Sequence, residues 1–254
     1  PGTVHRVDLT PENVTGFVFW TRNAKPFMHS LHELDTRGFA YYFLYTLLNY
    51  PRSLDPHSPR KPSATDAFRR LADSVGPDRV LWRYDPLILT PQTTVDWHKH
   101  NIEALLQNLH GATTTIIVSI VDPYRKTRRR LEQAKIHAEY APDTYFPLLQ
   151  WMVNAANDAG MQIQTCAEPD VDLPGINPGP CVDAERIHHL SKRPVSRARH
   201  RQRPGCLCHR SVDIGVNNTC AFGCRYCYAN ADHKQALANL KRHNPYHNSL
   251  IGDI

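Results

Sequence analysis

Short apolar runs rich in β-branched and aromatic residues alternate along the chain with longer windows in which apolar residues recur every three or four positions. The runs predict six strands: GFVFWT (16–21), AYYFLYT (40–46), RVLWRYD (79–85), TTIIVSIV (114–121), MQIQTCA (161–167) and SVDIGV (211–216). The longer windows predict helices from Ser63 to Gly76, from Val95 to a stop at Gly111, from Phe146 to Gly160, and near 182–191.

Strand and helix repeating in this order predict an α/β fold with right-handed crossovers and a parallel sheet, either doubly wound or curled into a barrel. We favour a partial or full (β/α) barrel. In such a barrel the chemistry lies where strands end, and polar side chains follow several predicted strands. Each one alone is typical of a helix cap or a turn, and their shared position is what favours a site. The candidates at these ends include Thr21, Arg22, Arg83, Asp85 and Cys166.

Composition favours one globular domain over residues 1–254, because 41% of the 254 residues are hydrophobic and can fill a core. No uninterrupted apolar run approaches the roughly 20 residues that span a bilayer, so we expect no membrane partner. The chain has no signal peptide and starts at Pro1, so we expect further sequence to precede it. Seven cysteines in close, uneven spacings fit a disulfide framework poorly, which favours a reducing cytoplasm.

The net charge of +6 is unevenly distributed. Basic residues gather from Arg186 to Arg210 without an acid after Arg186, and in RKTRRR at 125–130. An ordinary basic face and a surface for an anionic partner explain this equally well. That partner is either a nucleic acid or a small phosphorylated or carboxylated molecule. The Pro-rich stretch within 166–210 is expected to wrap around the barrel as a cysteine-containing segment.

Three cysteines lie within eight residues of NNTCAFGCRYCYAN, at Cys220, Cys224 and Cys227. Three thiolates leave one coordination position of a metal centre free for another ligand. Gly223 lets the backbone fold tightly between them, and Tyr226 precedes the last cysteine. A zinc site completed by a histidine such as His209 or His233 is the alternative.

The x₃-then-x₂ spacing, with an aromatic residue before the last cysteine, resembles the radical S-adenosylmethionine (SAM) superfamily. The resemblance implies a [4Fe–4S] cluster on Cys220, Cys224 and Cys227, with SAM chelating the fourth iron. It further implies that Tyr226 contacts the adenine of SAM and that Arg22 pairs with its carboxylate. Thr21, Arg83 and Asp85 are further candidates for cofactor or substrate contacts. Reduction of the cluster would need an electron donor such as flavodoxin or ferredoxin.

The motifs VFWTRN, VLWRYDP, TCAE, CVD, QRPGCLC and SVDIGVNNTCAFGCRYCYAN occur in the order found in the family called domain of unknown function 1848 (DUF1848). This resemblance covers nearly the whole chain. Members usually have an earlier strand with an Arg-Arg-Thr-Asp signature, which this sequence lacks, and many have Lys where Arg22 stands. Because the cysteine loop follows the last predicted strand, the resemblance implies a circularly permuted radical SAM barrel.

The remaining cysteines are Cys166, Cys181, Cys206 and Cys208, a full ligand set for a closed metal centre. We favour a second [4Fe–4S] cluster over zinc, and either metal over buried inert thiols. The leading hypothesis is therefore a radical SAM enzyme that generates a 5′-deoxyadenosyl radical for hydrogen abstraction from an unknown, possibly anionic substrate. The alternative is a nucleic-acid-binding protein stabilised by a zinc–cysteine site, without radical chemistry.

Overall fold

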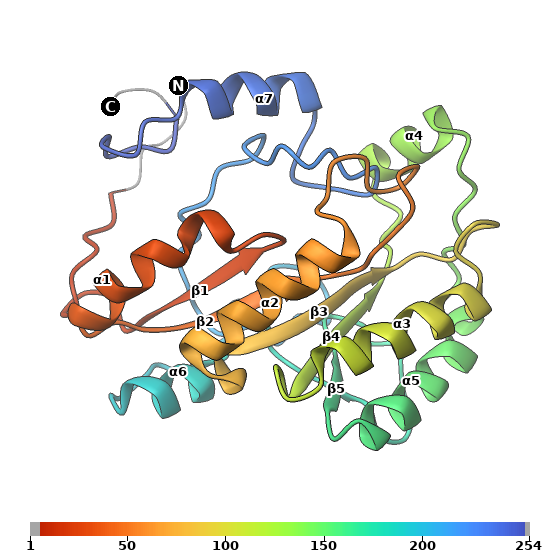
Figure 1. Cartoon of the computed structure of the whole chain (residues 1–254), viewed down its shortest axis with the longest axis horizontal. Helices are drawn as coiled ribbons and strands as arrows, with labels where there is room; N and C mark the ends of the chain where they lie inside the picture. Colours follow the sequence, from red (N-terminus) through yellow and green to blue (C-terminus); the bar gives the residue numbers. More distant parts are fainter. Residues whose placement is uncertain (1–5, 252–254) are drawn as a thin grey trace.

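The computed structural model describes residues 6–251, and its strands form one parallel sheet in the order of the sequence (Figure 1). The strands are β1 (Gly16–Thr21), β2 (Ala40–Thr46), β3 (Val80–Leu87), β4 (Thr115–Ile120), β5 (Gln162–Thr165) and β6 (Asn177–Pro178). All neighbouring pairs are parallel. The first five strands are those that the apolar runs predict.

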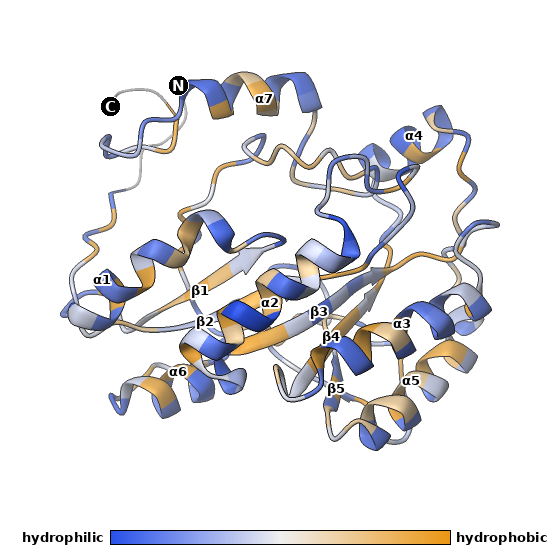
Figure 2. Cartoon of the chain, viewed as in Figure 1, coloured by the Kyte–Doolittle hydropathy of each residue, from blue (hydrophilic) through white to orange (hydrophobic). Residues whose placement is uncertain are grey.

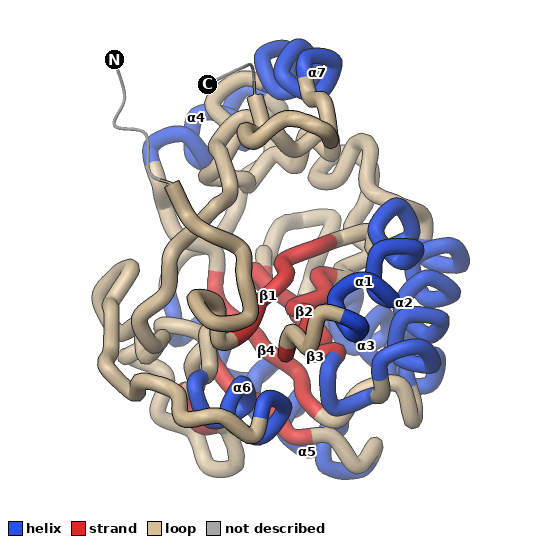
Figure 3. Tube along the Cα trace, turned by 90° about the vertical axis from the view of Figure 1, so that its left-hand side faces the viewer, coloured by secondary structure: helices blue, strands red, loops and turns tan. Residues whose placement is uncertain are grey.

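Crossover helices connect the strands, as parallel pairing requires. They are α1 (Leu31–Thr36), α2 (Lys61–Val75), α3 (Val95–Leu109), α4 (Arg125–Gln133) and α5 (Phe146–Asp158), followed by α6 (Ala184–Ser191) and α7 (His233–Arg242). Helices α1, α2 and α3 lie along one side of the strands, whereas loops and α6 lie along the other (Figure 3). No helix within residues 6–251 is long and apolar enough to cross a membrane.

The central strands are buried on both faces. In β2, Tyr41, Phe43 and Tyr45 enter the large core under the helices, while Tyr42 and Leu44 enter a smaller core on the opposite face. This two-sided burial explains why β2 is a continuous apolar run rather than an alternating one. Hydrophobic residues accordingly concentrate on the sheet and on the inward faces of the helices (Figure 2).

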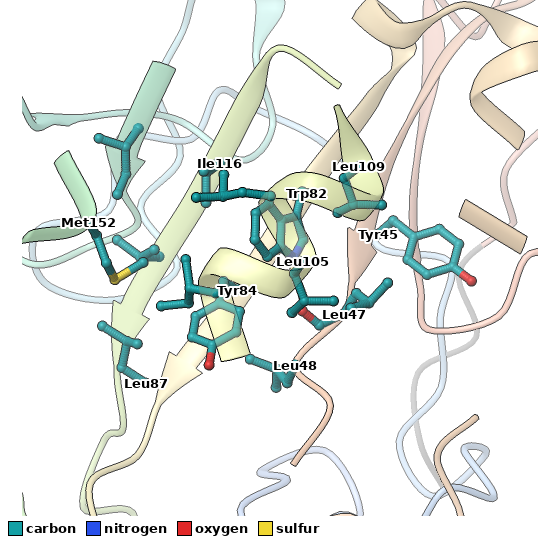
Figure 4. Packing of buried hydrophobic residues seen from close by; sticks show 14 of the residues in the cluster. Tyr45, Leu47, Leu48, Trp82, Tyr84, Leu87, Leu105, Leu109, Ile116 and Met152 are labelled. Atoms are coloured by element: carbon teal, nitrogen blue, oxygen red, sulfur yellow. The ribbon is translucent and has the colours of Figure 1, made fainter. Parts of the chain in front are cut away.

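Trp82 of β3 lies near the middle of the large core and is fully buried (Figure 4). Leu105 from α3 and Ile116 from β4 lie beside its indole in the close-up view. The indole N–H donates to the carbonyl oxygen of Leu47 at 2.8 Å, so its polar atom is satisfied inside the core. The core thus fixes the ends of β2 and β3 relative to each other.

The predicted α/β fold with a parallel sheet is confirmed, but a full barrel is wrong, because the sheet stays open with β1 and β6 at its edges. SVDIGV (211–216), expected as the last strand, has no regular secondary structure. Val212 and Ile214 are 67% and 50% exposed, so the segment buries too little apolar surface to hold a sheet edge. Asp213 and Gly215 are also poor strand formers. The cysteine loop therefore follows an irregular segment and not a strand.

Residues 166–210 cover the face of the sheet opposite α1–α3. They contain only β6 and α6 as regular elements, and α6 packs on β2. Cys181, Ile187, Cys206 and Cys208 join Tyr42, Leu44 and Ile117 in the smaller core. The segment thus packs on an open sheet through α6 and the smaller core.

A buried polar network ties α3 to the ends of β2 and β3. His98 Nδ1 lies 2.8 Å from the hydroxyl of Tyr84, and its Nε2 lies 3.1 Å from the carbonyl oxygen of Ile88. A carbonyl only accepts, so Nε2 carries the proton and Nδ1 accepts from Tyr84. Asn101 donates both to that hydroxyl and to the carbonyl oxygen of Leu48. The neutral imidazole satisfies every group in this arrangement.

This network predicts an acid-sensitive fold. Burial lowers the pKa of His98 to about 4, although the Ile88 carbonyl acts in the opposite sense. An unfolded histidine titrates near pH 6.5, so stability is lost as the pH falls from about 6.5 toward 4. When the pH is lowered from 7 to 5, the free energy of unfolding measured in urea should fall by about 2 kcal/mol more for the parent than for His98→Gln. Equal losses in both proteins would contradict this role of His98.

Candidate functional site

The cysteine loop 220–227 is docked on the loop that follows β2. The backbone N–H of Arg225 donates to the carbonyl oxygen of Leu54 at 2.9 Å, and that of His57 donates to Phe222 at 3.3 Å. A further hydrogen bond of 3.2 Å from the Cys227 N–H to the Cys224 carbonyl closes a tight turn between the last two cysteines. The loop is thereby held against the carboxyl ends of β1 and β2.

Gly223 directly precedes this turn, between the first two cysteines, and has a φ of +66°, a conformation that favours glycine. A Cβ atom there would lie 3.1 Å from Cε1 and Nδ1 of His233 and 3.3 Å from Cδ2 of His57. The two imidazoles are stacked, with ring centroids 5.1 Å apart. Nδ1 of His233 is buried and has no hydrogen-bond partner within the described residues. The turn therefore lies directly over two histidines.

Arg22, at the end of β1, is the centre of the charged part of the site. Its two terminal nitrogens contact the two carboxylate oxygens of Asp55 at 3.3 and 2.5 Å. The Nη1 atom also donates to the hydroxyl oxygen of Tyr226 at 2.7 Å and to Sγ of Cys224 at 3.0 Å. Tyr226 donates in turn to Asp55 at 2.7 Å. One guanidinium thus links β1, the loop after β2 and the cysteine loop.

Burial and charge act against each other in this cluster. Burial disfavours the guanidinium cation, but Tyr226, Asp55 and Cys224 outweigh it and hold the pKa of Arg22 well above its usual value. Burial raises the pKa of Cys224 to about 12, although Arg22 opposes the rise. Partial desolvation by neighbouring atoms also raises the pKa of Cys220, although its residue surface is exposed. The two cysteines are therefore neutral thiols here, and a metal must displace their protons on binding.

The three cysteines differ in accessibility. Cys220 is exposed, Cys227 is half-buried and Cys224 is buried. Three thiols on one loop are suitable in number and type for a cluster with one open position, and a side chain at Gly223 would press against His233 and His57. Even so, no group of three or more His, Cys, Asp and Glu side chains in residues 6–251 is already arranged to hold a metal ion.

A cavity of about 320 Å³ opens beside this cluster, between the end of β2 and the start of α2. Arg22 and Asp55 form part of its wall, and Arg60 and Lys61 contribute further cations. Arg60 is the N-cap residue of α2 without a side-chain cap, so the first turn of a 15-residue helix borders the cavity. Ser58 Oγ also lines it, is buried and has no hydrogen-bond partner in the described chain. These features favour a polar, negatively charged ligand.

The other strand-end candidates have partners of their own. Thr21 accepts a hydrogen bond from the Asn23 N–H at 3.0 Å and so stabilises its own turn. Arg83 forms an ion pair with Asp85, which also accepts from Ser119 Oγ at 2.8 Å. Asp85 lies where the register between β3 and β4 shifts, a local irregularity that redirects side chains. Arg83 and Asp85 both interact electrostatically with Tyr228, one residue beyond the triad.

A second charged cluster follows β4 and β5. Arg203 forms an ion pair with Asp122 and donates to the carbonyl oxygen of Cys166 at 3.0 Å. Glu168 accepts from the Ile120 N–H at 3.0 Å, and burial raises its pKa to about 7. The second cysteine set, Cys166, Cys181, Cys206 and Cys208, lies next to this cluster, on the face covered by 166–210.

Sequence reasoning missed Asp55, Arg52 and Ser58, which all lie in the Pro-rich loop PRSLDPHSPRKPS (51–63). Arg52 donates to the carbonyl oxygens of Asp55, Pro56 and Ser58 and so fixes the loop that presents Asp55. The sequence feature that could have indicated them is the pair Arg52 and Asp55 inside a proline-rich stretch that directly follows an apolar strand. Proline density alone predicted a loop and gave no indication that Leu54, Asp55 and Ser58 within it are buried.

The DUF1848 family, described as a domain of unknown function, matches residues 1–229 of the chain. The match includes every strand of the sheet, both cysteine sets, Arg22 and Asp55. Comparison with curated proteins and with solved structures gave no match.

The pairing of Arg22 with Asp55 predicts a large and specific stability effect. Asp55→Ala leaves a buried guanidinium without its counter-ion, which costs about 3–5 kcal/mol in comparable buried pairs. The matched control is Asp66→Ala, which removes an exposed partner of Lys25 at 3.3 Å and should cost less than about 1 kcal/mol. Urea denaturation measures both, and a cost below 1 kcal/mol for Asp55→Ala would mean that the pair does not hold the site together.

Proposed function

We propose that this chain, which belongs to the DUF1848 family, is a radical SAM enzyme. The observation that carries the proposal is the cysteine loop itself, joined through Cys224 and Tyr226 to Arg22 and Asp55 beside a polar cavity. Three thiols on one turn next to a cavity for an anionic ligand are what an open iron–sulfur centre with a chelating cofactor needs. An ordinary closed zinc site would need a fourth protein ligand.

Cys220, Cys224 and Cys227 would hold the [4Fe–4S] cluster. When bound and reduced, that cluster supplies the electron that breaks the sulfonium C–S bond of SAM and gives a 5′-deoxyadenosyl radical for hydrogen abstraction. The residues of this chain would bind the cluster, orient the cofactor and shield both from water. Arg22 donates a hydrogen bond to Cys224 and so favours its thiolate, and Gly223 keeps the turn close to His233.

The 320 Å³ cavity is the proposed location of the cofactor's charged end. Arg22 is already paired with Asp55, so an incoming carboxylate would share its guanidinium or use Arg60, Lys61 and the first turn of α2. Ser58 Oγ, without a partner in the described structure, is available for a ligand hydroxyl. Tyr226 is committed to Arg22 and Asp55 through its hydroxyl, which leaves the ring for contact with adenine.

Arg83 and Asp85 interact electrostatically with Tyr228, one residue beyond the triad, and these three residues are the proposed substrate contacts. A small anionic substrate suits this site better than a nucleic acid, because several arginines of 186–210 have internal roles. Arg197 pairs with Glu185, Arg199 donates to the carbonyl oxygen of Leu207, and Arg203 pairs with Asp122. An electron donor such as flavodoxin or ferredoxin completes the proposed system.

Replacing Cys220, Cys224 and Cys227 together with alanine should abolish conversion of SAM to 5′-deoxyadenosine by the anaerobically reconstituted, reduced protein. The circular dichroism spectrum should stay that of the parent, because the loop contributes no helix or strand. Iron, sulfide and 5′-deoxyadenosine are the quantities to measure. Undiminished 5′-deoxyadenosine in the triple variant would refute the assignment, and a colourless zinc protein without SAM cleavage would favour the alternative.

Gly223→Ala tests whether the shape of the turn matters for the centre. Its added Cβ meets His233 and also strains a positive φ, so we expect cluster iron and SAM cleavage to fall at least about tenfold, as for a few kcal/mol of strain. Gly111→Ala is the matched control, with a φ of +74° and open space around its Cβ. It should cost about 1 kcal/mol of stability and leave iron content unchanged. Equal iron in both variants would contradict the role of the turn.

A further inference from the structure

Four cysteines from three separate segments come together on the face of the sheet covered by 166–210. Cys166 directly follows β5, Cys181 follows the short β6, and Cys206 and Cys208 are reached after α6 and a long irregular stretch. All belong to or pack on the small core around Tyr42, Leu44 and Ile117. Inert buried thiols could be placed anywhere in a core, so their convergence from segments up to about 40 residues apart favours a shared role.

Two of the sulfur atoms are in direct contact, because Sγ of Cys181 lies 3.0 Å from Sγ of Cys166. The Cys181 thiol also interacts with that of Cys208, and Cys208 with Cys206. Each thiol therefore has another thiol among its polar partners. Thiols are weak hydrogen-bond donors and acceptors, so such interactions in a small core bring little stability by themselves.

The backbone around these thiols is held in place. The Tyr42 hydroxyl donates to the Cys181 carbonyl oxygen at 2.5 Å and accepts from the Asp183 N–H at 2.9 Å. The Cys206–Cys208 segment is tied back by hydrogen bonds from the His209 N–H to the Val182 carbonyl oxygen and from the His200 N–H to the Cys208 carbonyl oxygen, each 3.0 Å long. The loop is thus fixed close to Cys181, although it has no helix or extended strand of its own.

Polar groups of the chain lie close to these thiols. Val182 directs its backbone N–H at Sγ of Cys208 over 3.4 Å. The guanidinium of Arg83 interacts electrostatically with Cys181 and Cys166, and that of Arg203 with Cys166. Both guanidiniums are also paired with carboxylates, Arg83 with Asp85 and Arg203 with Asp122, so they are fixed in place beside the cysteines.

We propose that Cys166, Cys181, Cys206 and Cys208 bind a single tetrahedral metal ion such as Zn²⁺. Around zinc, sulfurs at about 2.3 Å form a tetrahedron with edges of about 3.8 Å, so the contacting thiols need to separate by less than 1 Å where they are closest. A four-iron cluster binds each cysteine at a different corner iron and so needs a much wider arrangement. The sulfur spacing therefore favours one ion over the second cluster expected from the sequence.

Binding is an exchange of protons for metal and involves no electron transfer. Four S–H groups lose their protons to solvent, four sulfur–metal bonds form, and the oxidation states do not change. In the structure Cys166 and Cys181 contact each other through their sulfur atoms, and the four thiols do not surround a common centre. The metal would staple the irregular segment to the sheet, which is the usual role of a closed Cys₄ site.

The test uses the full chain with Cys220, Cys224 and Cys227 replaced by alanine, so that the proposed catalytic centre cannot contribute. The purified protein, reduced and freed of metal, is titrated anaerobically with Zn²⁺ and separately with iron and sulfide. We expect about one zinc per chain, release of protons, loss of four reactive thiols, a raised melting temperature, and a tetrahedral thiolate spectrum when Co²⁺ replaces zinc.

Adding Cys206→Ser to that background removes one ligand from a loop and should weaken zinc binding at least about tenfold. Leu207→Ala, which alters the same loop between the two cysteines, is the matched control and should keep the metal. Uptake of about four irons with sulfide and no zinc would overturn the proposal, as would a disulfide between Cys166 and Cys181 or no metal binding. None of these results depends on SAM cleavage, so this proposal and the proposed function fail separately.

Discussion

The buried pairing of Arg22 with Asp55 is the interaction on which the arrangement of the site depends. Arg22 follows β1 and Asp55 belongs to the loop after β2. The paired guanidinium also donates hydrogen bonds to Tyr226 and Cys224, which lie near the other end of the chain. A buried cation is tolerated only with a counter-ion and saturated donors. Because Arg22 has both, the cysteine loop is fixed in register with the sheet although it forms no strand with it.

This dependence explains how an open sheet can present a site expected of a barrel. Closure of a barrel would bring the last segment beside the first by backbone pairing. Here side-chain contacts bring the cysteine loop to the carboxyl end of β1, and 211–216 crosses without pairing. Backbone hydrogen bonds between the cysteine loop and Leu54 and His57 complete the attachment. The proximity needed for chemistry is therefore obtained without the topology that usually provides it.

The sequence predicted the first five strands and the long helices, because two-sided burial and 3.6-residue periodicity leave a strong signal in each of them. It failed at SVDIGV, where an alternating pattern has no neighbour to bury it, and at β6, which is too short to show a pattern. In the site, Arg22 and Tyr226 could be found from strand ends and cysteine spacing. Asp55 could not, because its importance comes from a contact 33 residues away in sequence with Arg22.

The two cysteine sets lie on different surfaces of the molecule for a physical reason. The triad is on a loop with Cys220 open to solvent, and Cys224 is linked to Arg22, which lines a polar cavity. The second set is enclosed between the sheet and 166–210, with three of its four members buried. An open set of three suits a centre that must bind a further molecule, and an enclosed set of four suits one that must not. Arg83 interacts electrostatically with Cys181 and Cys166 of the second set. Arg83 and Asp85 also interact with Tyr228, which follows the triad. This residue pair of β3 therefore connects the two cysteine sets electrostatically.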